Sequence, residues 1–321
     1  MMLKCAVLDD YQKCASGLAD WSRIAGLVNV EFFHKNIASE KRLVEMLLPY
    51  DIIVAMRERT PFSSAILRQL PQLKLLVTTG MRNAAIDLEA AAERGIVVSG
   101  TEGTGQATSE LTIGLMLASV RHLPTEFANM REGRWQTTVG VGLQGLRLGI
   151  IGLGRIGNQV ATVAKALGMQ VSAWSQNLTE QKCAVVGVDC AESLDHLLVM
   201  SDIVSIHTQL SSHTIGLIGE NELRRMKPSA ILINTSRALI VEQQALATAL
   251  RERWIASAAV DVYETEPLPA NHPFRFIPNL VATPHLGYVA EDNLRSNFSM
   301  AVENIEAWLA GSSIRIIEQL Q

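Results

Sequence analysis

The stretch "GIIGLGRIGNQVATVAKALGMQVSAWSQN", Gly149 to Asn177, has the pattern of a strand, a glycine turn, a helix and a second strand. Its glycines follow the spacing G-x-G-x-x-G, directly after the apolar run Leu148 to Ile151. Glycines at this spacing allow a tight turn and a close approach of the backbone to a pyrophosphate, and the helix that follows offers N–H groups to the anion. The stretch therefore predicts a dinucleotide site on the turn residues Gly152, Gly154, Arg155, Ile156 and Gly157.

The composition bounds the class of protein. The chain has 321 residues, of which 48% are hydrophobic, and this length suggests about two domains. A net charge of −4, with no run of Lys or Arg, gives no electrostatic footprint for nucleic acid or for an acidic membrane. The most apolar stretch, Leu111 to Val120, is far shorter than the ~20 residues that span a bilayer. Small molecules are the expected partners.

The start of the chain and its cysteines indicate a reducing compartment. "MMLKCAVLDDYQ" leads straight into a predicted strand without the pattern of a secretory signal, so we expect a cytoplasmic protein. The four cysteines show no C-x-x-C spacing, and we expect reduced thiols rather than disulfides or a metal site.

Strand-like runs alternate with helical patterns along the chain and fall into two groups. The first group comprises Ala6–Leu8, Val28–Phe33, Ile52–Ala55, Leu73–Val77 and Ile96–Val98. The second begins at Leu148 and continues with Val171–Trp174, Ile203–Ile206, Ile231–Asn234, Ala256–Val260 and Leu280–Ala282. Such alternation predicts an α/β protein with two doubly wound parallel sheets.

The end of the chain is too short for a third domain. It offers one long helical stretch, Glu291–Leu309, and an apolar tail, and we expect both to fold back on the first group of strands. The predicted organisation is a dinucleotide-binding Rossmann domain, residues 103–285, inserted into a flavodoxin-like substrate domain, residues 1–102 and 286–321. This insertion explains why the glycine turn lies in the middle of the chain.

Three ionisable residues follow predicted strands, where open α/β sheets bind their ligands. Arg237 ends "LINTSR", Glu266 lies in "AVDVYETEP", and His285 lies in "ATPHLGY". A guanidinium can hold a carboxylate with two parallel hydrogen bonds. A carboxylate paired with an imidazole favours the charged ring, which makes a proton donor suited to the reduction of a carbonyl. Each residue alone could also be structural.

The chain resembles the D-isomer-specific 2-hydroxyacid dehydrogenases over essentially its full length. The resemblance rests on "LGIIGLGRIG", "DIVSIHTQL", "HTIGLIGENELRRMKPSAILINTSRA", "AAVDVYETEPLP" and "NLVATPHLGY", in this order. It implies an oxidoreductase that moves a hydride between NAD(P)H and the carbonyl carbon of a small 2-oxo acid, giving a D-2-hydroxy acid. Because the same fold also serves a dinucleotide-sensing corepressor, a binding protein is the alternative.

The resemblance also implies roles for single residues. Arg237 binds the carboxylate and carbonyl of the 2-oxo acid, His285 exchanges the hydroxyl proton, and Glu266 pairs with His285. Glu266 is preferred to Glu264 because the family's glutamate lies five residues beyond the strand-end aspartate, here Asp261. The residues expected to line the coenzyme are His207, Thr208, Thr235 and Asp261.

A loop and a helix complete the resemblance. "TTGMRNAAIDLEAAAERGI" resembles the segment whose backbone N–H groups, here near Met81 and Arg82, hold the substrate carboxylate. Arg57, Arg59 and Arg82 lie in turns that either face the substrate or lie at the surface. The helix Ala107–His122 resembles one that joins the two domains and supports subunit pairing, so we expect a homodimer.

The sequence departs from the family pattern beside the coenzyme. Gln209 replaces a usual proline, and Ala238 and Leu239 replace two common glycines, which leaves the identity of the 2-oxo acid open. Ser175 occupies the position where an NAD site normally has Asp or Glu. From Ser175 to Gln181 there is no Lys or Arg to pair with a 2′-phosphate, so the choice between NAD and NADP stays open as well.

Overall fold

The structure, a computed structural model, describes residues 2–318. The chain divides into two compact units, Met1–Gly103 with Ala290–Gln321 (unit 1) and Thr104–Val289 (unit 2). The sequence placed the second boundary after His285, and the structure places it after Val289. The difference arises because the amides of Leu286 and Gly287 are bonded to Asp261 of unit 2.

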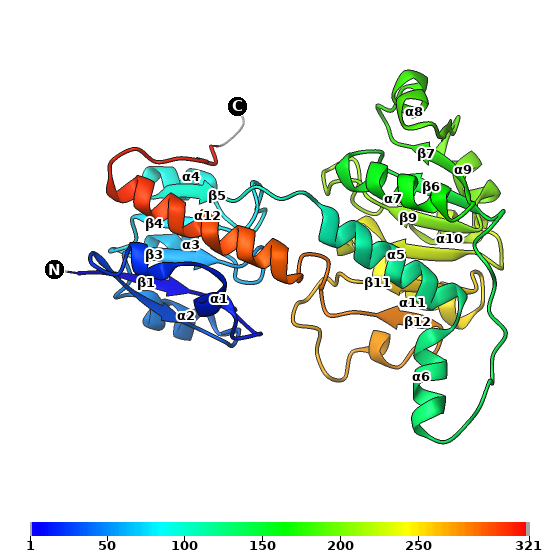
Figure 1. The fold of residues 1–321 in the computed structure, drawn as a ribbon, viewed down its shortest axis with the longest axis horizontal. Coiled ribbons are helices and arrows are strands. Elements are labelled where there is room, and N and C mark those ends of the chain that lie inside the picture. The colour runs from blue at the N-terminus through cyan, green and yellow to red at the C-terminus, as the bar shows by residue number, and fades with distance from the viewer. Residues whose placement is uncertain (1, 319–321) are drawn as a thin grey trace. The chain divides into compact units, whose positions relative to one another are not determined.

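The described residues of unit 1 form a five-stranded parallel sheet in the order β2-β1-β3-β4-β5 (Figure 1). This order is that of a flavodoxin-like doubly wound sheet. The strands are short, and the central ones are buried on both faces, as parallel sheets require. They are β1 (Leu3–Val7), β2 (Val28–Phe32), β3 (Ile52–Ala55), β4 (Leu75–Thr78) and β5 (Val97–Gly100).

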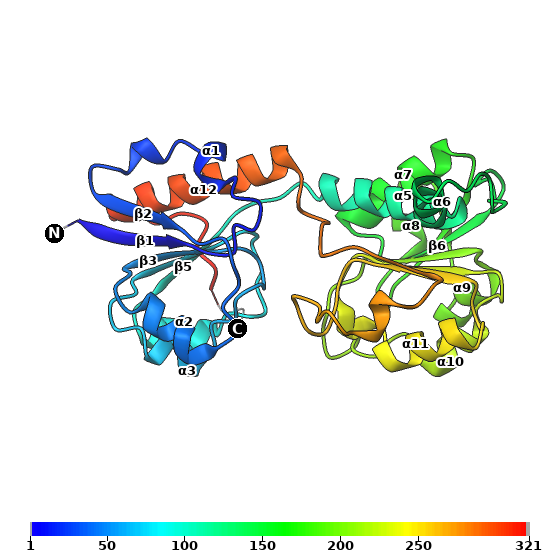
Figure 2. The ribbon, with the colours of Figure 1, turned by 90° about the horizontal axis from the view of Figure 1, so that it is seen from below.

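Helices cover both faces of this sheet. Figure 2 shows α1 and α12 on one face and α2 and α3 on the other. Phe298 and Ile305 of α12 are buried in the core of the unit. The helices are α1 (Ala15–Leu18), α2 (Glu40–Leu47), α3 (Ser64–Arg68), α4 (Leu88–Glu93) and α12 (Glu291–Leu309), with a 3-10 turn η1 (Trp21–Arg23).

The apolar tail that follows α12 joins the edge strand of unit 1. Ile316 forms an antiparallel bridge with Ser99, and the Ile317 amide donates to the carbonyl oxygen of Val98 at 2.8 Å. The tail therefore pairs with β5, as the sequence predicts for a segment too short to form a domain.

The described residues of unit 2 form a seven-stranded parallel sheet in the order β12-β11-β10-β9-β6-β7-β8. The order reverses between β6 and β9, which is the switch point of a Rossmann sheet. The strands are β6 (Arg147–Ile151), β7 (Gln170–Trp174), β8 (Asp189–Cys190), β9 (Ile203–Ile206), β10 (Ile231–Asn234), β11 (Ser257–Val260) and β12 (Leu280–Ala282).

Side chains of the sheet alternate between two apolar cores, one on each face. Leu148 and Ile150 of β6 belong to the core shared with Met116 and Val160, whereas Ile151 belongs to the core shared with Leu246. This alternation follows from the period of two in a strand. Figure 2 shows α5 and α7 on one face of the sheet and α10 and α11 on the other.

The helices of unit 2 differ from the sequence expectation at one point. The predicted helix Ala107–His122 is interrupted, because His122 has a φ of +51° and cannot continue a right-handed helix. The helices are α5 (Gln106–Val120), α6 (Leu123–Arg131), α7 (Arg155–Ala166), α8 (Glu180–Val186), α9 (Leu194–Met200), α10 (Glu220–Arg225) and α11 (Gln243–Arg251), with 3-10 turns η2 (Ala238–Ile240) and η3 (Pro273–Arg275).

Candidate active site

The carboxyl ends of the unit 2 strands meet at one edge of the sheet because the strands are parallel and in register. Ile206 pairs with both Ile151 and Asn234, and Val260 pairs with both Asn234 and Ala282. The residues that follow these strands therefore emerge at the same edge. They include Gly152, Ser175, His207, Thr235, Arg237, Asp261, Glu266 and His285.

The glycine turn after β6 leaves no room for side chains at two positions. Gly152 has a φ of +99°, and a Cβ there would lie 2.7 Å from the amide nitrogen of Thr208. A Cβ at Gly157 would lie 2.2 Å from the carbonyl oxygen of Gly152. At Gly154, in contrast, an added Cβ would meet no described atom within 4 Å, so the backbone at the start of α7 faces open space. This arrangement fits a pyrophosphate at the helix N-terminus.

Ser175 lies next to this turn. It follows β7 directly, and the last residue of β7, Trp174, accepts a hydrogen bond from the Gly152 amide at 2.8 Å. Gln176 and Asn177 are exposed beyond it. The described residues 175–177 thus present hydroxyl and amide groups where a coenzyme ribose is expected.

His207 and Thr208 lie between the glycine turn and the Arg237 loop. The Nε2 atom of His207 lies 2.8 Å from Ser205 Oγ. The residue is half-buried, and burial lowers the pKa of His207 to about 4. Its ring is therefore neutral near pH 7. The carbonyl oxygen of Thr208 accepts a hydrogen bond from the hydroxyl of Ser236.

Glu266 and His285 form a hydrogen-bonded pair. Glu266 Oε2 lies 2.6 Å from Nδ1 of His285, and its other carboxylate oxygen accepts the Tyr263 amide at 2.9 Å. His285 has a φ of +53°, and its ring makes an edge contact with Tyr288 at 5.2 Å between centroids. The pairing directs Nε2 of the ring away from the glutamate.

Asp261 is fully buried and holds the loop that carries His285. Its carboxylate accepts hydrogen bonds from the Thr283 hydroxyl at 2.6 Å, the Leu286 amide at 2.7 Å and the Gly287 amide at 2.8 Å. Burial raises its pKa above the ordinary value, while these hydrogen bonds act in the opposite direction. The structure thus gives Asp261 a clear contact with the His285 loop.

Arg237 is held by a turn built on Asn234. The side chain of Asn234 accepts the Ser236 amide at 3.0 Å and donates to the carbonyl oxygen of Arg237 at 3.0 Å. Sequence reasoning did not select Asn234 as a site residue. A signal existed, because an Asn at a strand end that binds the backbone two residues on is typical of such turns.

Thr235, predicted to line the coenzyme, also contacts a helix of unit 2. Its hydroxyl lies 2.8 Å from the hydroxyl of Thr112 on α5. The sequence did not predict Thr112 or its helix neighbour Thr108 as site residues. No local pattern marks them, because their partners Thr235 and Gly287 lie more than a hundred residues away.

The remaining predicted residues belong to unit 1. Met81 and Arg82 are exposed in the loop after β4. Arg57 Nη1 donates to the carbonyl oxygen of Thr79 at 3.1 Å and lies 2.0 Å from the position that a Cβ on Gly80 would occupy. Arg59 Nη1 donates to the carbonyl oxygen of Asp9 at 2.5 Å, and its guanidinium lies 4.2 Å from the ring centre of Tyr11. Both arginines therefore contact loops of unit 1.

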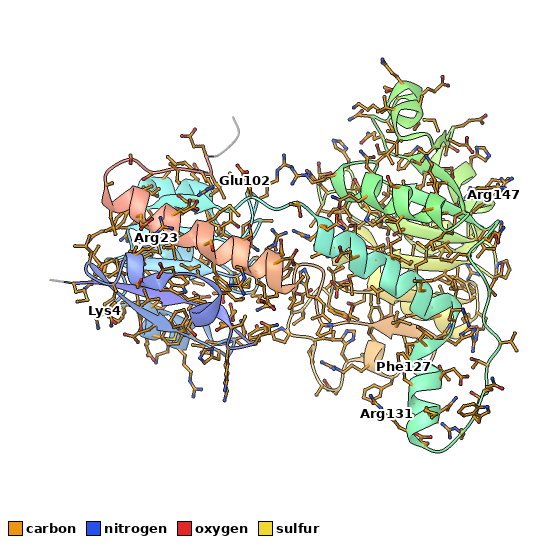
Figure 3. The ribbon with its side chains drawn as sticks, in the orientation of Figure 1. Lys4, Arg23, Glu102, Phe127, Arg131 and Arg147 are labelled. Carbon is orange, nitrogen blue, oxygen red and sulfur yellow. The ribbon has the colours of Figure 1, made fainter. Side chains whose placement is uncertain are left out.

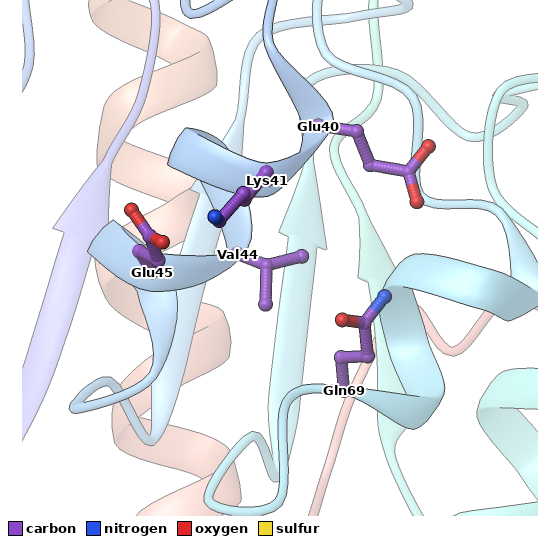
Figure 4. Close-up of a pocket in the computed structure, with 5 residues that line it drawn as sticks. All are labelled: Glu40, Lys41, Val44, Glu45 and Gln69. Carbon is purple, nitrogen blue, oxygen red and sulfur yellow. The ribbon is translucent and has the colours of Figure 1, made fainter.

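Other features of the described residues do not form a second site. A surface pocket on α2 and the end of α3 is lined by Glu40, Lys41, Val44, Glu45 and Gln69 (Figure 4), and none of these residues is among the predicted ones. Within residues 2–318, no three His, Cys, Asp or Glu side chains gather as metal ligands. No described helix is long and apolar enough to cross a membrane.

Most of unit 2 matches a known protein family. The family model of the D-isomer specific 2-hydroxyacid dehydrogenase, NAD binding domain, matches residues 113–287, which include the glycine turn and the Glu266–His285 pair. The chain belongs to this family. It is therefore an oxidoreductase whose unit 2 binds a nicotinamide dinucleotide, NAD or NADP.

Named relatives of this dehydrogenase fall into two groups. It is 40% identical over 256 residues to the glyoxylate reductase of Aeropyrum pernix, covering 77% of this chain and 76% of that protein. It is 33% identical over 276 residues to the D-3-phosphoglycerate dehydrogenase of Methanocaldococcus jannaschii, covering 85% of this chain. The match spans only 52% of that phosphoglycerate dehydrogenase, about half its length. These names give no support to a corepressor.

A solved structure shares the whole fold. The phosphoglycerate oxidoreductase of Vibrio cholerae superposes with a TM-score of 0.92 at 35% identity, covering 97% of this chain and 100% of that one. The fold class predicted from the sequence is therefore confirmed, and so is the family.

Proposed function

We propose that this dehydrogenase reduces a small 2-oxo acid to a D-2-hydroxy acid, with Arg237, Glu266 and His285 as its catalytic residues. The observation that carries the proposal is the 2.6 Å pairing of Glu266 with His285 at the sheet edge where Arg237 also emerges. Support comes from the names of the relatives, which include glyoxylate reductases.

Each of the three residues has a distinct task. Arg237 binds the carboxylate of the substrate and polarises its carbonyl oxygen, because a planar guanidinium offers parallel donors. His285, protonated and oriented by Glu266 at Nδ1, donates its Nε2 proton to the carbonyl oxygen. Glu266 fixes the orientation of the ring through its contact with Nδ1. The nicotinamide dinucleotide, when bound, supplies the hydride that reaches the carbonyl carbon.

The coenzyme is held by unit 2. The pyrophosphate binds to the N–H groups at the start of α7, near Arg155, Ile156 and Gly157. Ser175 contacts the ribose of the adenosine. His207, Thr208, Thr235 and Asp261 lie along the remaining strand ends toward the nicotinamide. With no carboxylate at Ser175 to repel a 2′-phosphate, we infer that NADH and NADPH are used with efficiencies within about tenfold of each other, equivalent to ~1.4 kcal/mol.

We infer that the exposed loop of Met81 and Arg82 in unit 1 offers backbone N–H donors to a small carboxylate. Their amides need no side-chain ordering, which favours tight recognition of a small anion. Ala238 and Leu239 add side chains to the turn after Arg237, where the family commonly has glycines. These side chains leave less space beside Arg237 and so restrict the size of the 2-oxo acid.

The test is a panel of 2-oxo acids assayed by absorbance of the reduced nicotinamide. Glyoxylate, hydroxypyruvate, phenylpyruvate and a branched 2-oxo acid are each offered with NADH and with NADPH. The proposal is supported if the parent consumes the reduced nicotinamide with at least one acid and His285→Ala does not. An unchanged absorbance across the panel, in a protein that binds the coenzyme, would reject it.

We further propose that the enzyme is a homodimer. Figure 1 shows α6 and the segment after it standing away from the sheet of unit 2, and Figure 3 marks Phe127 and Arg131 on that helix. Large apolar side chains on this arm are exposed, and a second copy of the arm would cover them. They are Phe127, Met130, Trp135, Val139 and Val141.

A further inference from the structure

Helix α5 carries two threonines whose hydroxyls bind the loops of the candidate active site. Thr108 Oγ1 donates to the carbonyl oxygen of Gly287 at 2.8 Å, and Gly287 lies two residues after His285. Thr112 Oγ1 lies 2.8 Å from Thr235 Oγ1, and Thr235 lies two residues before Arg237. One helix therefore contacts both the loop of His285 and the loop of Arg237.

The hydrogen positions in this chain of contacts follow from counting donors. Thr112 Oγ1 also donates to the carbonyl oxygen of Thr108 at 2.8 Å. A hydroxyl has one hydrogen, so the bond between Thr112 and Thr235 uses the hydrogen of Thr235. Each of the three hydroxyls thus donates once. Because Thr112 is fully buried, removal of its oxygen leaves Thr235 and the Thr108 carbonyl without that partner in a place closed to water.

The loop of His285 has a conformation that needs such support. A φ of +53° is uncommon for a residue other than glycine and persists where surrounding contacts hold it. Asp261 holds the amides of Leu286 and Gly287, and Thr108 holds the carbonyl oxygen of Gly287. The loop is therefore held both by its backbone N–H groups and by a backbone carbonyl oxygen.

The two threonines lie one helical turn apart. Four residues of α-helix span about 6 Å, and a helix is stiff over this length. Because Thr108 and Thr112 bind different loops, α5 sets the separation of those loops along its axis. A misplacement of about 1 Å between reacting groups lowers a rate by up to about a hundredfold.

We propose that Thr108 and Thr112 are positioning residues that fix the placement of His285 relative to Arg237. The kinetic part of this proposal rests on the proposed function of those two residues. Both threonines precede the family match, which begins at residue 113.

The kinetic experiment replaces each threonine by valine, which keeps the shape and removes the hydroxyl, and by serine, which keeps the hydroxyl. Thr108→Val lowers kcat at least tenfold with KM for the 2-oxo acid within twofold of the parent, because it acts on the loop of the proton donor. Thr112→Val raises this KM and lowers kcat together, because it acts on the loop of Arg237. Each serine variant restores most of the parent rate, and the Kd of the coenzyme is unchanged in Thr108→Val.

A matched control lies on the same helix. Ser119 is buried, and its hydroxyl donates only within α5 among the described contacts, to the carbonyl oxygen of Leu115 at 2.8 Å. Ser119→Ala therefore removes a buried hydroxyl without touching either loop, and its kinetics match the parent. The proposal is overturned if kcat/KM for the 2-oxo acid falls equally in Ser119→Ala and Thr112→Val. It is also overturned if a serine variant is as slow as its valine counterpart.

A second measurement does not depend on turnover. Hydrogen–deuterium exchange of the protein without substrate reports on the segments 283–289 and 234–238. Thr108→Val speeds exchange in the first segment and Thr112→Val in the second, while Ser119→Ala changes neither. Unchanged exchange in both valine variants rejects the positioning role. If the valine variants show these changes but the parent reduces no 2-oxo acid, only the proposed function is rejected.

Discussion

Arg237 is proposed to bind the substrate through the planar geometry of its guanidinium, which lysine does not share. In Arg237→Lys, one ammonium takes the place of a planar fork, so the substrate loses a charge-assisted hydrogen bond worth about 1.5–3 kcal/mol. We expect kcat/KM for the 2-oxo acid to fall about 10- to 100-fold, with KM raised and kcat lowered. Steady-state kinetics check this, and Arg251→Lys on α11 serves as the control. Parent kinetics in Arg237→Lys would remove this arginine from the mechanism.

Glu266 and Glu264 provide a direct comparison of two carboxylates in one loop. Glu266 contacts His285 at 2.6 Å, whereas Glu264 is exposed. Glu266→Gln removes the carboxylate that orients the His285 ring, and we expect the reductive rate to fall by about 10²-fold, on the scale of general acid catalysis. Glu264→Gln keeps the parent rate. Rates measured at pH 7 decide the matter, and equal rates for the two variants would contradict the pairing.

His207 couples the stability of the protein to pH. Its ordinary pKa of 6.5 applies to the unfolded chain, and burial lowers it to about 4 in the fold. Between these values only the unfolded chain takes up the proton, so stability falls as the pH falls from 6.5 to 4, by up to ~1.4 kcal/mol per pH unit from this group. Above pH 6.5 the group contributes nothing to the pH dependence.

The variant His207→Gln tests this linkage. Between pH 7 and pH 5 we expect the free energy of unfolding to fall by about 2 kcal/mol less than in the parent, measured by urea denaturation at each pH. His213→Gln, which alters an exposed histidine, leaves the fall unchanged. A parent and a His207→Gln variant with the same pH dependence would show that this ring is protonated equally in both states.

We infer that the end of strand β7 governs the choice between NADH and NADPH. Ser175→Asp places a carboxylate where the adenosine ribose is expected, and like-charge repulsion disfavours a 2′-phosphate. We expect the ratio of kcat/KM for NADH to that for NADPH to rise at least tenfold, or ~1.4 kcal/mol. Gln181→Glu adds the same charge on α8 and serves as the control. A parent that already discriminates by more than about a hundredfold would contradict relaxed use of the coenzyme.

Elements were predictable from the sequence where their pattern is strong and local. The strands Ile52–Ala55, Ile203–Ile206 and Ile231–Asn234 have the predicted bounds, and so does the helix Glu291–Leu309. The two-residue strand Asp189–Cys190 was not predicted, because it has no periodic pattern and is defined by pairing with β7. The end of α5 was misplaced because the break comes from the backbone angle of His122, which the residue type does not announce.

The site was predictable in its members more than in its contacts. Arg237, Glu266 and His285 follow strands, as the motifs indicate, but their roles stay predictions. The contacts of Thr108 with Gly287 and of Thr112 with Thr235 join residues 179 and 123 positions apart. No local propensity encodes such pairs, because they depend on how the helices pack on the sheet.

The state of assembly is a property of the whole molecule. If the arm of α6 pairs with a second copy, the parent sediments as two chains of 35.1 kDa. Trp135→Glu buries a charge in that interface, and we expect the dimer to weaken at least tenfold. Val185→Glu, on an exposed apolar residue of α8, leaves the mass unchanged. Sedimentation equilibrium measures both, and a parent of single-chain mass would refute the dimer.

The division of unit 1 into two segments has a consequence for folding during synthesis. Unit 2 is continuous, so all of its strands have been synthesised before residue 290 is added. The core of unit 1 lacks Phe298, Val302 and Ile305 until α12 follows, and β5 lacks its pairing with Ile316. Domains generally fold as their chain becomes complete. The later unit to reach its native state is therefore the one that is synthesised first, and its exposed apolar sheet is the surface that a chaperone would protect meanwhile.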